Sequence, residues 1–380
     1  MIDALYCHIP FCETICPFCA FAVHGNRPAL HAPLLRALQA ESEGTAAAHG
    51  PALAPLRAVY LGGGTPSTLA LEEVAALLEA LRRCFPFAAD CELAFELNPE
   101  HATPAYLEGL VALGVNRASL GLQSLDDATL RALGRHNDAA QGRRALEALR
   151  THGPANWNAD LMFGAPHRPG EAFRQDVRTL AALGAPHLSL YGLDIEPGTP
   201  FARNAAVRAW AAAHGDGQAA DYAWAAEHLV SRGYRHYEVS NFCRPGLEGR
   251  QNLIVWDGGN YLGLGPGAHS HRDGRRWHNE RHLRAWLRRV EAGETPVAYE
   301  ERLTPAQQAN EALMLALRRD TGLDVTGWQA RFGVAWDAPR QALAARLVAE
   351  GRATQQAGRL TLTPAGLLLA DEITEALAVG

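Results

Sequence analysis

The sequence predicts an α/β fold, a parallel sheet of six strand–helix units that curves into an open partial barrel, followed by a small C-terminal domain. Two observations predict it. From residue 1 to about residue 240, short apolar stretches alternate with stretches of helical periodicity, and this order is typical of a parallel sheet with helices outside it. From residue 301 the pattern changes to helices around a hairpin, which is typical of a winged-helix module.

The order of elements follows from apolar runs and their periods. Strands are predicted at residues 5–9, 58–61, 93–97, 117–122, 157–163 and 187–193. Helices are predicted at residues 71–83, 103–113, 127–133, 141–149, 171–183 and 207–231. We therefore divide the chain into a barrel with the cluster-type cysteine loop, residues 1–245, a connecting segment, residues 246–300, and a winged-helix-like C-terminal domain, residues 301–380.

In the C-terminal domain, helices are predicted at residues 305–318, 325–332, 339–350 and 364–377, with a hairpin of residues 352–356 and 359–363. Winged helices often bind DNA, but residues 301–380 carry eight arginines against nine acidic residues. This balance lacks the positive footprint that DNA binding requires. We expect no nucleic-acid partner, and we interpret the domain as a lid or a partner surface.

Composition excludes several chemistries. The chain of 380 residues contains no lysine, so its 35 basic residues are all arginines. This excludes Schiff-base catalysis by a lysine, the P-loop and the protein kinases. The net charge of −6 argues against general binding to nucleic acid or to an anionic membrane. No apolar run approaches the roughly 18 residues of a membrane span, and the first residues lack the features of a signal peptide, so we expect a cytoplasmic protein with reduced thiols.

The cysteines are clustered near the start of the chain. Cys12, Cys16 and Cys19 have spacings that place three thiols on one short loop, and thiolates select zinc or iron–sulfur clusters. Structural zinc normally has four ligands, often as two separated pairs, and no second pair is present. Cys7 lies in the first predicted strand, on the face opposite Tyr6, and we expect it to pack in the core. A three-cysteine site would leave one iron of a cubane cluster open to another ligand.

Polar residues and glycines follow the predicted strands, at the end where parallel α/β barrels carry their functional residues. Glycines at residues 62–64 let the backbone approach a ligand closely, and Thr65 adds a hydroxyl. Buried polar side chains need partners, so Glu96, Gln123 and Asp160 at equivalent strand ends suggest one shared polar ligand.

Three further polar residues lie nearby in the sequence. Arg135 offers a planar fork that suits a carboxylate, and the alternative is a surface arginine at a helix end. We interpret Asn98 and Asp194 as loop or helix caps.

The sequence Tyr-Cys-His-Ile-Pro-Phe-Cys at residues 6–12, followed by Cys-Pro-Phe-Cys at residues 16–19, resembles the cluster loop of the radical S-adenosylmethionine (radical SAM) enzymes. More narrowly, it resembles the oxygen-independent coproporphyrinogen III oxidases and their haem-chaperone branch, the HemW type. The resemblance implies a [4Fe–4S] cluster on Cys12, Cys16 and Cys19, with S-adenosylmethionine chelating the fourth iron and yielding a 5′-deoxyadenosyl radical on reduction, chemistry that belongs to the cofactor. The positions that match the family's contacts with S-adenosylmethionine are Tyr6, Phe18, Gly63, Gly64, Thr65, Glu96, Gln123, Arg135 and Asp160.

Two departures from the oxidases favour the chaperone branch. Phe21 stands where the oxidases carry a fourth cysteine, and five residues precede Tyr6 where the oxidases have a long extension. Further matches at residues 189–191, 195–201, 237–242 and 261–269 extend the resemblance over nearly the whole chain. It implies as partners haem or a porphyrin(ogen), an electron donor such as flavodoxin or ferredoxin, and a haem-acceptor protein. The alternatives are a coproporphyrinogen oxidase, a related methyltransferase, and a structural zinc protein with a regulatory winged helix.

The expected haem motif is altered. The chaperone branch usually shows His-Asn, two residues, then Tyr-Trp, but residues 251–256 begin with Gln251, and glutamine is a poor iron ligand. The branch's Arg-x-His motif also differs, because residues 135–137 read Arg-His-Asn. Four histidines lie further along the chain, and we hypothesise that one of them ligates haem, the alternative being that they are solvated: His269, His271, His278 and His282. The spacing of the last two predicts one face of a helix.

Overall fold

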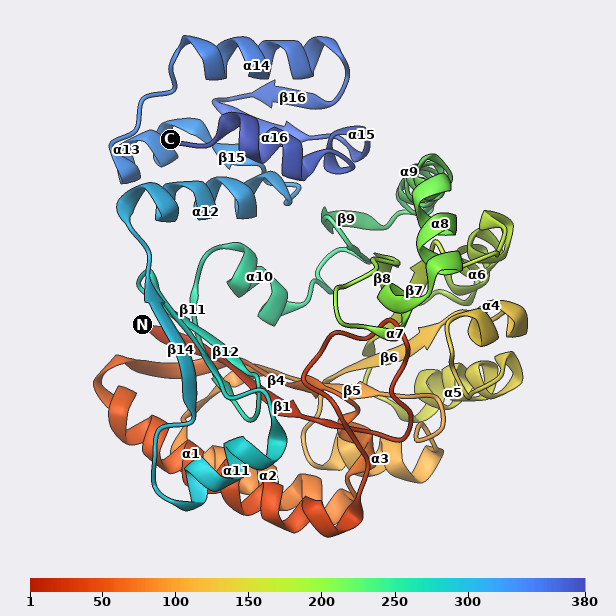
Figure 1. Cartoon of the computed structure of the whole chain (residues 1–380), viewed down its shortest axis with the longest axis vertical. Coiled ribbons are helices and arrows are strands. Elements are labelled where there is room, and N and C mark those ends of the chain that lie inside the picture. The colour runs from red at the N-terminus through yellow and green to blue at the C-terminus, as the bar shows by residue number, and fades with distance from the viewer. Residues whose placement is uncertain (380) are drawn as a thin grey trace.

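Six parallel strands form the middle of one large sheet, as predicted. They are β1 (Ile2–Ile9), β4 (Leu53–Gly63), β5 (Phe87–Leu97), β6 (Arg117–Gln123), β7 (Asn156–Phe163) and β8 (His187–Gly192). Each of them pairs in parallel with the next in this order. The computed structural model describes residues 1–379, and in this part of the chain the sheet curves without closing into a barrel (Figure 1).

Further strands extend this sheet at both ends. They are β9 (Arg235–Glu238), β10 (Asn241–Cys243), β11 (Asn260–Leu264), β12 (His269–Arg272), β13 (Arg275–Asn279) and β14 (Val297–Arg302). β11 runs parallel to β1, and β12, β13 and β14 follow it as antiparallel neighbours. The segment of residues 246–300, expected only to connect, therefore builds one side of the sheet. Its strands contain many polar residues, so the apolar runs that marked the other strands are missing.

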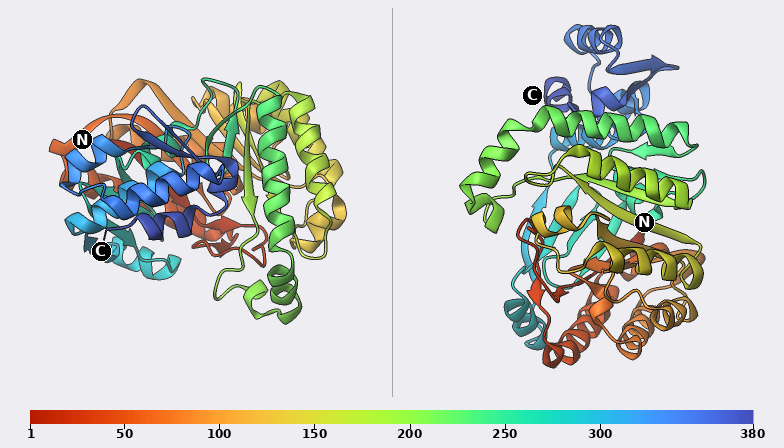
Figure 2. Two further views of the ribbon diagram at one scale, coloured as in Figure 1. Left: turned by 90° about the horizontal axis from the view of Figure 1, so that it is seen from above. Right: turned by 90° about the vertical axis from the view of Figure 1, so that its right-hand side faces the viewer.

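Helices cover the outer side of the sheet (Figures 1 and 2). They are α1 (His31–His49), α2 (Leu71–Cys84), α3 (Pro104–Ala112), α4 (Asp127–Ala132), α5 (Ala139–His152), α6 (Gly170–Leu183) and α9 (Gly215–Ser231). α8 (Ala205–Ala213) precedes α9 and projects away from the sheet (Figure 2). The apolar period predicted for α2 is confirmed, because Val74, Leu77, Leu78 and Leu81 are all buried.

The single helix predicted at residues 207–231 is wrong, since the chain breaks between α8 and α9. His214 leaves the helical conformation with φ −123° and ψ 14°, and two glycines, Gly215 and Gly217, follow it. Glycine weakens a helix because it loses more backbone freedom than other residues when it becomes ordered.

Cys7 is a core residue, as predicted. Its side chain is fully buried in β1 among apolar residues such as Leu5, Val59 and Leu264, which belong to the main core of the molecule. Alternation along the strand places Cys7 on the face opposite Tyr6 and His8, whose side chains point toward the concave side of the sheet and its cavities.

The C-terminal domain has its own core. Its elements are α12 (Pro305–Leu317), β15 (Leu323–Asp324), α13 (Val325–Phe332), α14 (Ala338–Ala349), β16 (Ala353–Gln356), β17 (Arg359–Leu362), α15 (Pro364–Leu367) and α16 (Ala370–Leu377). The predicted hairpin is β16–β17, and β15 adds a third strand to it. The final predicted helix is two helices. The chain breaks near Leu369; Leu367 packs against both the main core and the domain's own core, and Ile373 is buried in the domain's core.

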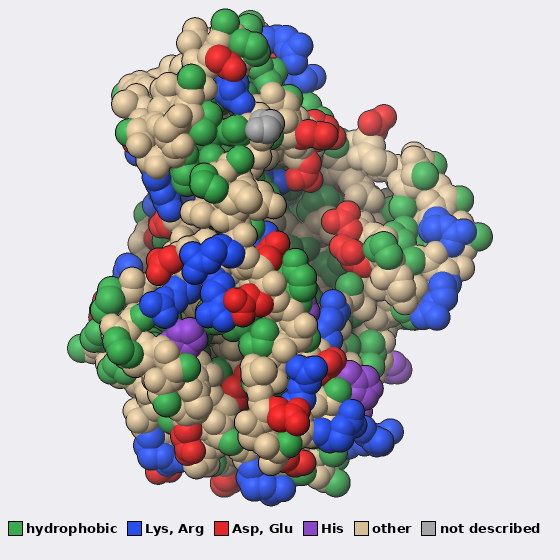
Figure 3. Space-filling model, turned by 60° about the vertical axis from the view of Figure 1, so that its left-hand side comes forward, with side chains coloured by type: hydrophobic (Ala, Val, Ile, Leu, Met, Phe, Trp, Pro, Cys, Tyr) green, Lys and Arg blue, Asp and Glu red, His purple; other side chains and the backbone are tan. Residues whose placement is uncertain are grey.

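The C-terminal domain lies across the gap between the two edge strands of the sheet, because α12 follows β14 and Arg319 pairs with Glu238 of β9 (Figure 1). A cavity of about 990 Å³ lies between it and the barrel, lined on one side by residues such as Asp3 and Trp256 and on the other by Arg319 and Trp328. Figure 3 shows a hollow below this domain on one face of the molecule. Within residues 1–379, no helix is both long enough and apolar enough to cross a membrane.

Candidate functional site

The cysteine loop follows β1 and is closed at its base by two short parallel strands, β2 (Phe11–Cys12) and β3 (His24–Gly25). The amide of His24 donates to the carbonyl of Pro10 at 2.7 Å, and the amide of Asn26 donates to the carbonyl of Cys12 at 2.8 Å. The thiols of Cys12, Cys16 and Cys19 all line one cavity of about 460 Å³. The spacing seen in the sequence thus brings three thiols to one space.

Phe18 lines the same cavity. The loop is seated on the short helix α7 (Pro200–Arg203), where the amide of Phe201 donates to the carbonyl of Pro17 at 3.0 Å. The rings of Phe18 and Phe201 lie 6.2 Å apart and pack in a small apolar cluster. A segment after the sixth strand therefore positions the aromatic side of the cavity.

The glycine turn after β4 must be free of side chains. Gly63 has φ +115°, and a Cβ there would lie 2.4 Å from the ring of His8. A Cβ on Gly64 would lie 2.7 Å from the carbonyl oxygen of Phe11. The backbone of the turn therefore lies directly against the base of the cysteine loop, which is the close approach that only glycine permits.

Two partly buried carboxyl groups line the cavity, Glu96 at the end of β5 and Asp160 in β7. Glu96 accepts hydrogen bonds from the hydroxyl of Tyr60 at 2.8 Å and from the amide of Gly63 at 2.9 Å. Burial raises the pKa of Glu96 to about 7; the hydrogen bond from Tyr60 opposes this rise and the charge of Asp160 adds to it. Burial also raises the pKa of Asp160 to about 6, against hydrogen bonds from its neighbours. A ligand that brings a cation or hydroxyl groups would favour the charged forms.

Arg135 reaches into the cavity and is not a surface arginine. Its Nη2 donates to the carbonyl of Gly121 at 2.9 Å and to Oδ1 of Asn98 at 3.2 Å, and its Nη1 lies 3.7 Å from the sulfur of Cys16. Asn98 also donates to the hydroxyl of Thr65 at 3.3 Å, and that hydroxyl lies 3.6 Å from the sulfur of Cys12. The guanidinium of Arg135 and the side-chain amide of Asn98 thus link Cys12 and Cys16 to the ends of β4, β5 and β6.

The interpretation of Asn98 as a cap is wrong, because its side chain lines the cavity and Thr103 caps the following helix. Asp194 is not among the residues that line the cavity, whereas Glu196 is. Asn98 could have been recognised in the sequence, since it stands two residues after Glu96 and therefore on the same side of an extended chain.

Gln123 ends β6 in the left-handed region, with φ +64°, and lines the cavity. A non-glycine residue held there carries backbone strain, which is common at functional sites. Ser119 and Met162 also line the cavity and were not predicted. Ser119 lies four residues before Gln123 in the same strand and donates to Asp160.

Tyr6 lies beside the cysteine cavity and lines an adjoining one of about 470 Å³, together with His8, Gln251 and His269. The two cavities share Gly63, Glu96, Ala20 and Phe21. The hydroxyl of Tyr6 donates to Nδ1 of His8 at 2.9 Å, and Nε2 of His8 donates to the carbonyl of Ala22 at 2.9 Å. Burial lowers the pKa of His8 to about 4, so its ring is neutral and ties the cysteine loop to β1.

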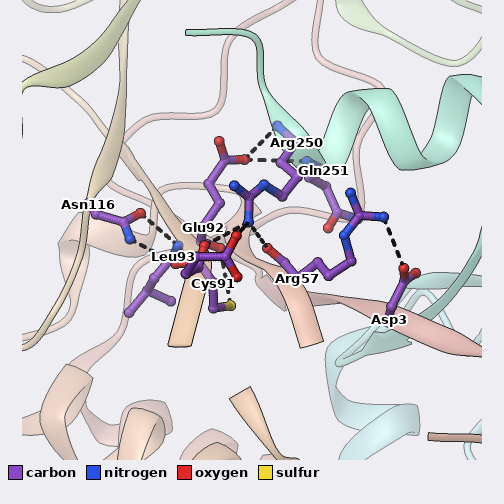
Figure 4. A network of polar contacts seen from close by, with 9 residues as sticks. Asp3, Arg57, Cys91, Glu92, Leu93, Asn116, Arg250 and Gln251 are labelled. Carbon is purple, nitrogen blue, oxygen red and sulfur yellow. Dashed lines mark hydrogen bonds and ion pairs between the residues drawn. The ribbon is translucent and has the colours of Figure 1, made fainter. Parts of the chain in front are cut away.

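Gln251 begins the helix α10 (Arg250–Trp256), which runs past this second cavity. Figure 4 shows Glu92 of β5 reaching the first turn of α10, where one carboxylate oxygen accepts from the amide of Arg250 at 2.8 Å and from that of Gln251 at 3.3 Å. The side chain of Gln251 is only 7% exposed, and its Oε1 has no hydrogen-bond partner among the described residues. Glu92 thus holds the backbone of Gln251 in place, while the side-chain amide oxygen of Gln251 has no hydrogen-bond partner among the described residues.

The four histidines considered as haem ligands lie in different environments. His269 on β12 and His278 on β13 are directly opposite each other, and their ring centroids lie 5.0 Å apart. The prediction that His278 and His282 share a helix face is wrong, because His278 is in a strand and His282 precedes α11 (Leu283–Glu291).

We next consider whether the residues suit the cluster that their spacing predicts. Within residues 1–379, no three His, Cys, Asp or Glu side chains converge on a position for a single ion. An iron–sulfur cluster holds each cysteine on a different iron, so it requires thiols around a shared space. The three cysteines meet that requirement. The adjacent carboxyl groups and guanidinium match the amino, hydroxyl and carboxylate groups of an amino-acid nucleoside.

Comparisons with known proteins identify two domain families in the chain. Residues 6–180 match the Radical SAM superfamily, and residues 303–369 match the HemN C-terminal domain. A heme chaperone HemW from Mycobacterium tuberculosis is 36% identical over 380 residues, which cover 98% of this chain and 94% of that protein. A heme chaperone HemW from Bacillus subtilis is 29% identical and covers 98% of each chain.

A further relative and a solved structure extend the comparison. The mouse mitochondrial radical S-adenosyl methionine domain-containing protein 1 is 35% identical over 86% of this chain and 75% of that protein. The structure of coproporphyrinogen III oxidase HemN from Escherichia coli superposes with a TM-score of 0.83 at 23% identity, covering 100% of this chain and 90% of that one. The last similarity shows that the fold is shared over the whole chain.

Proposed function

The chain belongs to the HemW family of the radical SAM superfamily, and on this premise we propose that it is a haem chaperone that transfers haem to an acceptor protein. The observation that carries the proposal is the full-length similarity to the curated HemW proteins, together with three thiols that line one cavity with partly buried carboxyl groups and an arginine.

Membership of the superfamily implies a [4Fe–4S] cluster and S-adenosylmethionine. In our proposal Cys12, Cys16 and Cys19 hold the cluster. The residues proposed to bind S-adenosylmethionine are Phe18, Gly63, Gly64, Thr65, Glu96, Gln123, Arg135 and Asp160. When bound and reduced, the two cofactors together supply radical chemistry.

The side chains around the cofactors have separate tasks in this proposal. Arg135 binds a carboxylate and is held in place by Asn98 and the carbonyl of Gly121. Glu96 and Asp160 accept from hydroxyl or ammonium groups, and their pKa values, raised by burial, fall when such groups bind. Phe18 excludes water on the aromatic side. Tyr6 acts through His8, which fixes the cysteine loop.

Haem is the proposed cargo, and the partners follow from it: an electron donor for the cluster and a protein that accepts haem. We place the protein in the cytoplasm, where reducing conditions keep free thiols available as ligands. All seven cysteines are free in the structure.

Anaerobic purification and haem titration test the proposal. We expect a brown protein with about four irons per chain, and loss of iron in Cys16→Ser but not in the matched variant Cys84→Ser. We further expect a shifted Soret band on addition of haem, and passage of that haem to apomyoglobin as a model acceptor. Incubation with coproporphyrinogen III, S-adenosylmethionine and dithionite should give no decarboxylation. Decarboxylation without haem binding would identify an oxidase instead.

A further inference from the structure

Four histidines lie near the altered haem motif, and the hydrogen bonds distinguish between them. His271 is buried, and both of its ring nitrogens are engaged: Nδ1 with the carbonyl of Gly259 at 2.9 Å, and Nε2 with the amide of Gly274 at 3.4 Å. His282 precedes α11 and is not among the residues that line the two cavities described below. These two are poorly placed to ligate an iron.

His269 and His278 differ from them. They are opposite each other on β12 and β13, so both side chains project from the same face of the sheet. Nδ1 of His278 donates to the carbonyl of Asn279 at 3.0 Å, which leaves its Nε2 lone pair free. This is the arrangement that orients most metal-binding histidines. No hydrogen bond occupies the ring of His269 among the described residues.

His269 stands where two cavities adjoin. One is the cavity of about 470 Å³ that contains Tyr6 and Gln251, and the other, of about 380 Å³, contains His278 and Tyr299. The two share Val255, Tyr261 and His269. Each is within the roughly 300–1,000 Å³ typical of small-molecule sites. Aromatic side chains line part of both cavities, Phe21 and Tyr60 in the first and Trp277 and Tyr299 in the second, and they suit a large flat ligand.

The first of these cavities also offers a positive charge to a ligand. Arg281 lines the same cavity, and only its Nη2 is engaged, by the carbonyl of Ala20 at 2.7 Å. Its remaining N–H groups can donate hydrogen bonds to a carboxylate of a ligand.

We propose that haem binds in the joined cavities, that His269 ligates its iron with His278 beside it, and that Arg281 binds one of its carboxylates. The inference rests on the proposed function, because it takes haem as the cargo. It moves the iron ligand from the helix α10, where Gln251 stands, to the β12–β13 hairpin. Burial, His278, Arg281 and Arg276 all lower the pKa of His269, which favours the neutral imidazole that binds iron.

Titration of the full-length protein with ferric haem tests the inference. Wild type is expected to shift the Soret band, while His269→Ala binds haem at least 10-fold more weakly and with a different Soret maximum. His278→Ala is expected to have a smaller effect. His282→Ala is the matched control from the same segment and should bind as wild type does. Free imidazole should restore the wild-type Soret maximum in His269→Gly, because it replaces the lost ligand, whereas a merely structural role would give no rescue.

Two results would overturn the inference, and they are distinguishable. If wild type binds haem and His269→Ala binds it within threefold with the same Soret maximum, His269 is not the ligand and the proposed function stands. If wild type binds no haem, the proposed cargo is wrong and the inference fails with it. Circular dichroism melting of each variant, with a midpoint near that of wild type, shows that any loss is not a loss of fold.

Discussion

The amide of Gly63 donates a 2.9 Å hydrogen bond to Oε2 of Glu96, and this bond joins the ends of β4 and β5 at the mouth of the cysteine cavity. The other oxygen of Glu96 accepts from Tyr60 at 2.8 Å. The carboxyl group is therefore fixed in position while burial disfavours its charge. A carboxyl group that is held in place and has no cationic partner is suited to bind the positive or hydroxyl groups of a ligand.

This relationship predicts a pH-dependent stability. Because the pKa of Glu96 is raised from 4.5 to about 7 in the folded protein, the folded state binds a proton that the unfolded state releases between these values. The contribution of Glu96 to the free energy of unfolding therefore falls as the pH rises from about 4.5 to about 7. Glu96→Gln removes this titration, so its stability relative to wild type should rise by on the order of 1–3 kcal/mol between pH 5 and pH 8.

Urea denaturation of the ligand-free protein at the two pH values measures this difference. Glu72→Gln, at an exposed position on α2, is the control and should show the same difference from wild type at both. A difference for Glu96→Gln that does not change with pH would contradict the raised pKa.

Gly64→Ala should destabilise the protein by about 1–3 kcal/mol, because its Cβ would lie 2.7 Å from backbone atoms of Pro10 and Phe11, and backbone cannot yield as a flexible side chain can. Gly25→Ala is the matched control on the other side of the same loop, since a Cβ there meets nothing within 4 Å. Thermal melting of both variants provides the comparison. Equal melting temperatures would show that the turn is not tightly held against the loop.

Arg135→Ala should weaken S-adenosylmethionine binding about 10- to 100-fold, as expected for loss of a charged hydrogen bond. Arg135→Lys keeps the charge but loses the fork that reaches Asn98 and Gly121 together, so it should also bind more weakly than wild type. Calorimetric titration of the reconstituted protein measures both affinities. Arg131→Ala, exposed on α4 nearby, should retain wild-type affinity. Unchanged binding in Arg135→Ala would remove this residue from the proposed site.

Glu41→Ala should lower the free energy of unfolding by about 2 kcal/mol or more. The carboxyl of Glu41 is buried and accepts from the amide of Gly265 at 2.8 Å and from the side chain of Asn279. Removing the carboxyl takes away the acceptor of both hydrogen bonds in the interior of the protein. Glu43→Ala, two residues later on the exposed side of α1, should change stability by less than about 0.5 kcal/mol. Similar denaturation midpoints for the two variants would contradict this role.

The fold was largely predictable because its signals are local. Apolar runs and helical periods located the six parallel strands, and α2 buries the very residues that its period indicated. The extension of the sheet by β11 was not predictable in this way, since it depends on pairing Tyr6 with Gly263 across most of the chain. Polar strands without apolar runs are recognised only once their neighbours are known.

The candidate site was likewise predictable where local sequence features determine it, and not where tertiary packing does. Spacing alone brought Cys12, Cys16 and Cys19 to one loop, and the ends of parallel strands brought Glu96 and Asp160 to one cavity, because both arrangements follow from chain geometry. The sequence could not show that Asn98 joins Arg135, that Tyr6 lines a second cavity, or that His278 faces His269 and not His282. Those relationships depend on how strands and loops pack against one another, and only the packing of the whole chain decides which side chains meet.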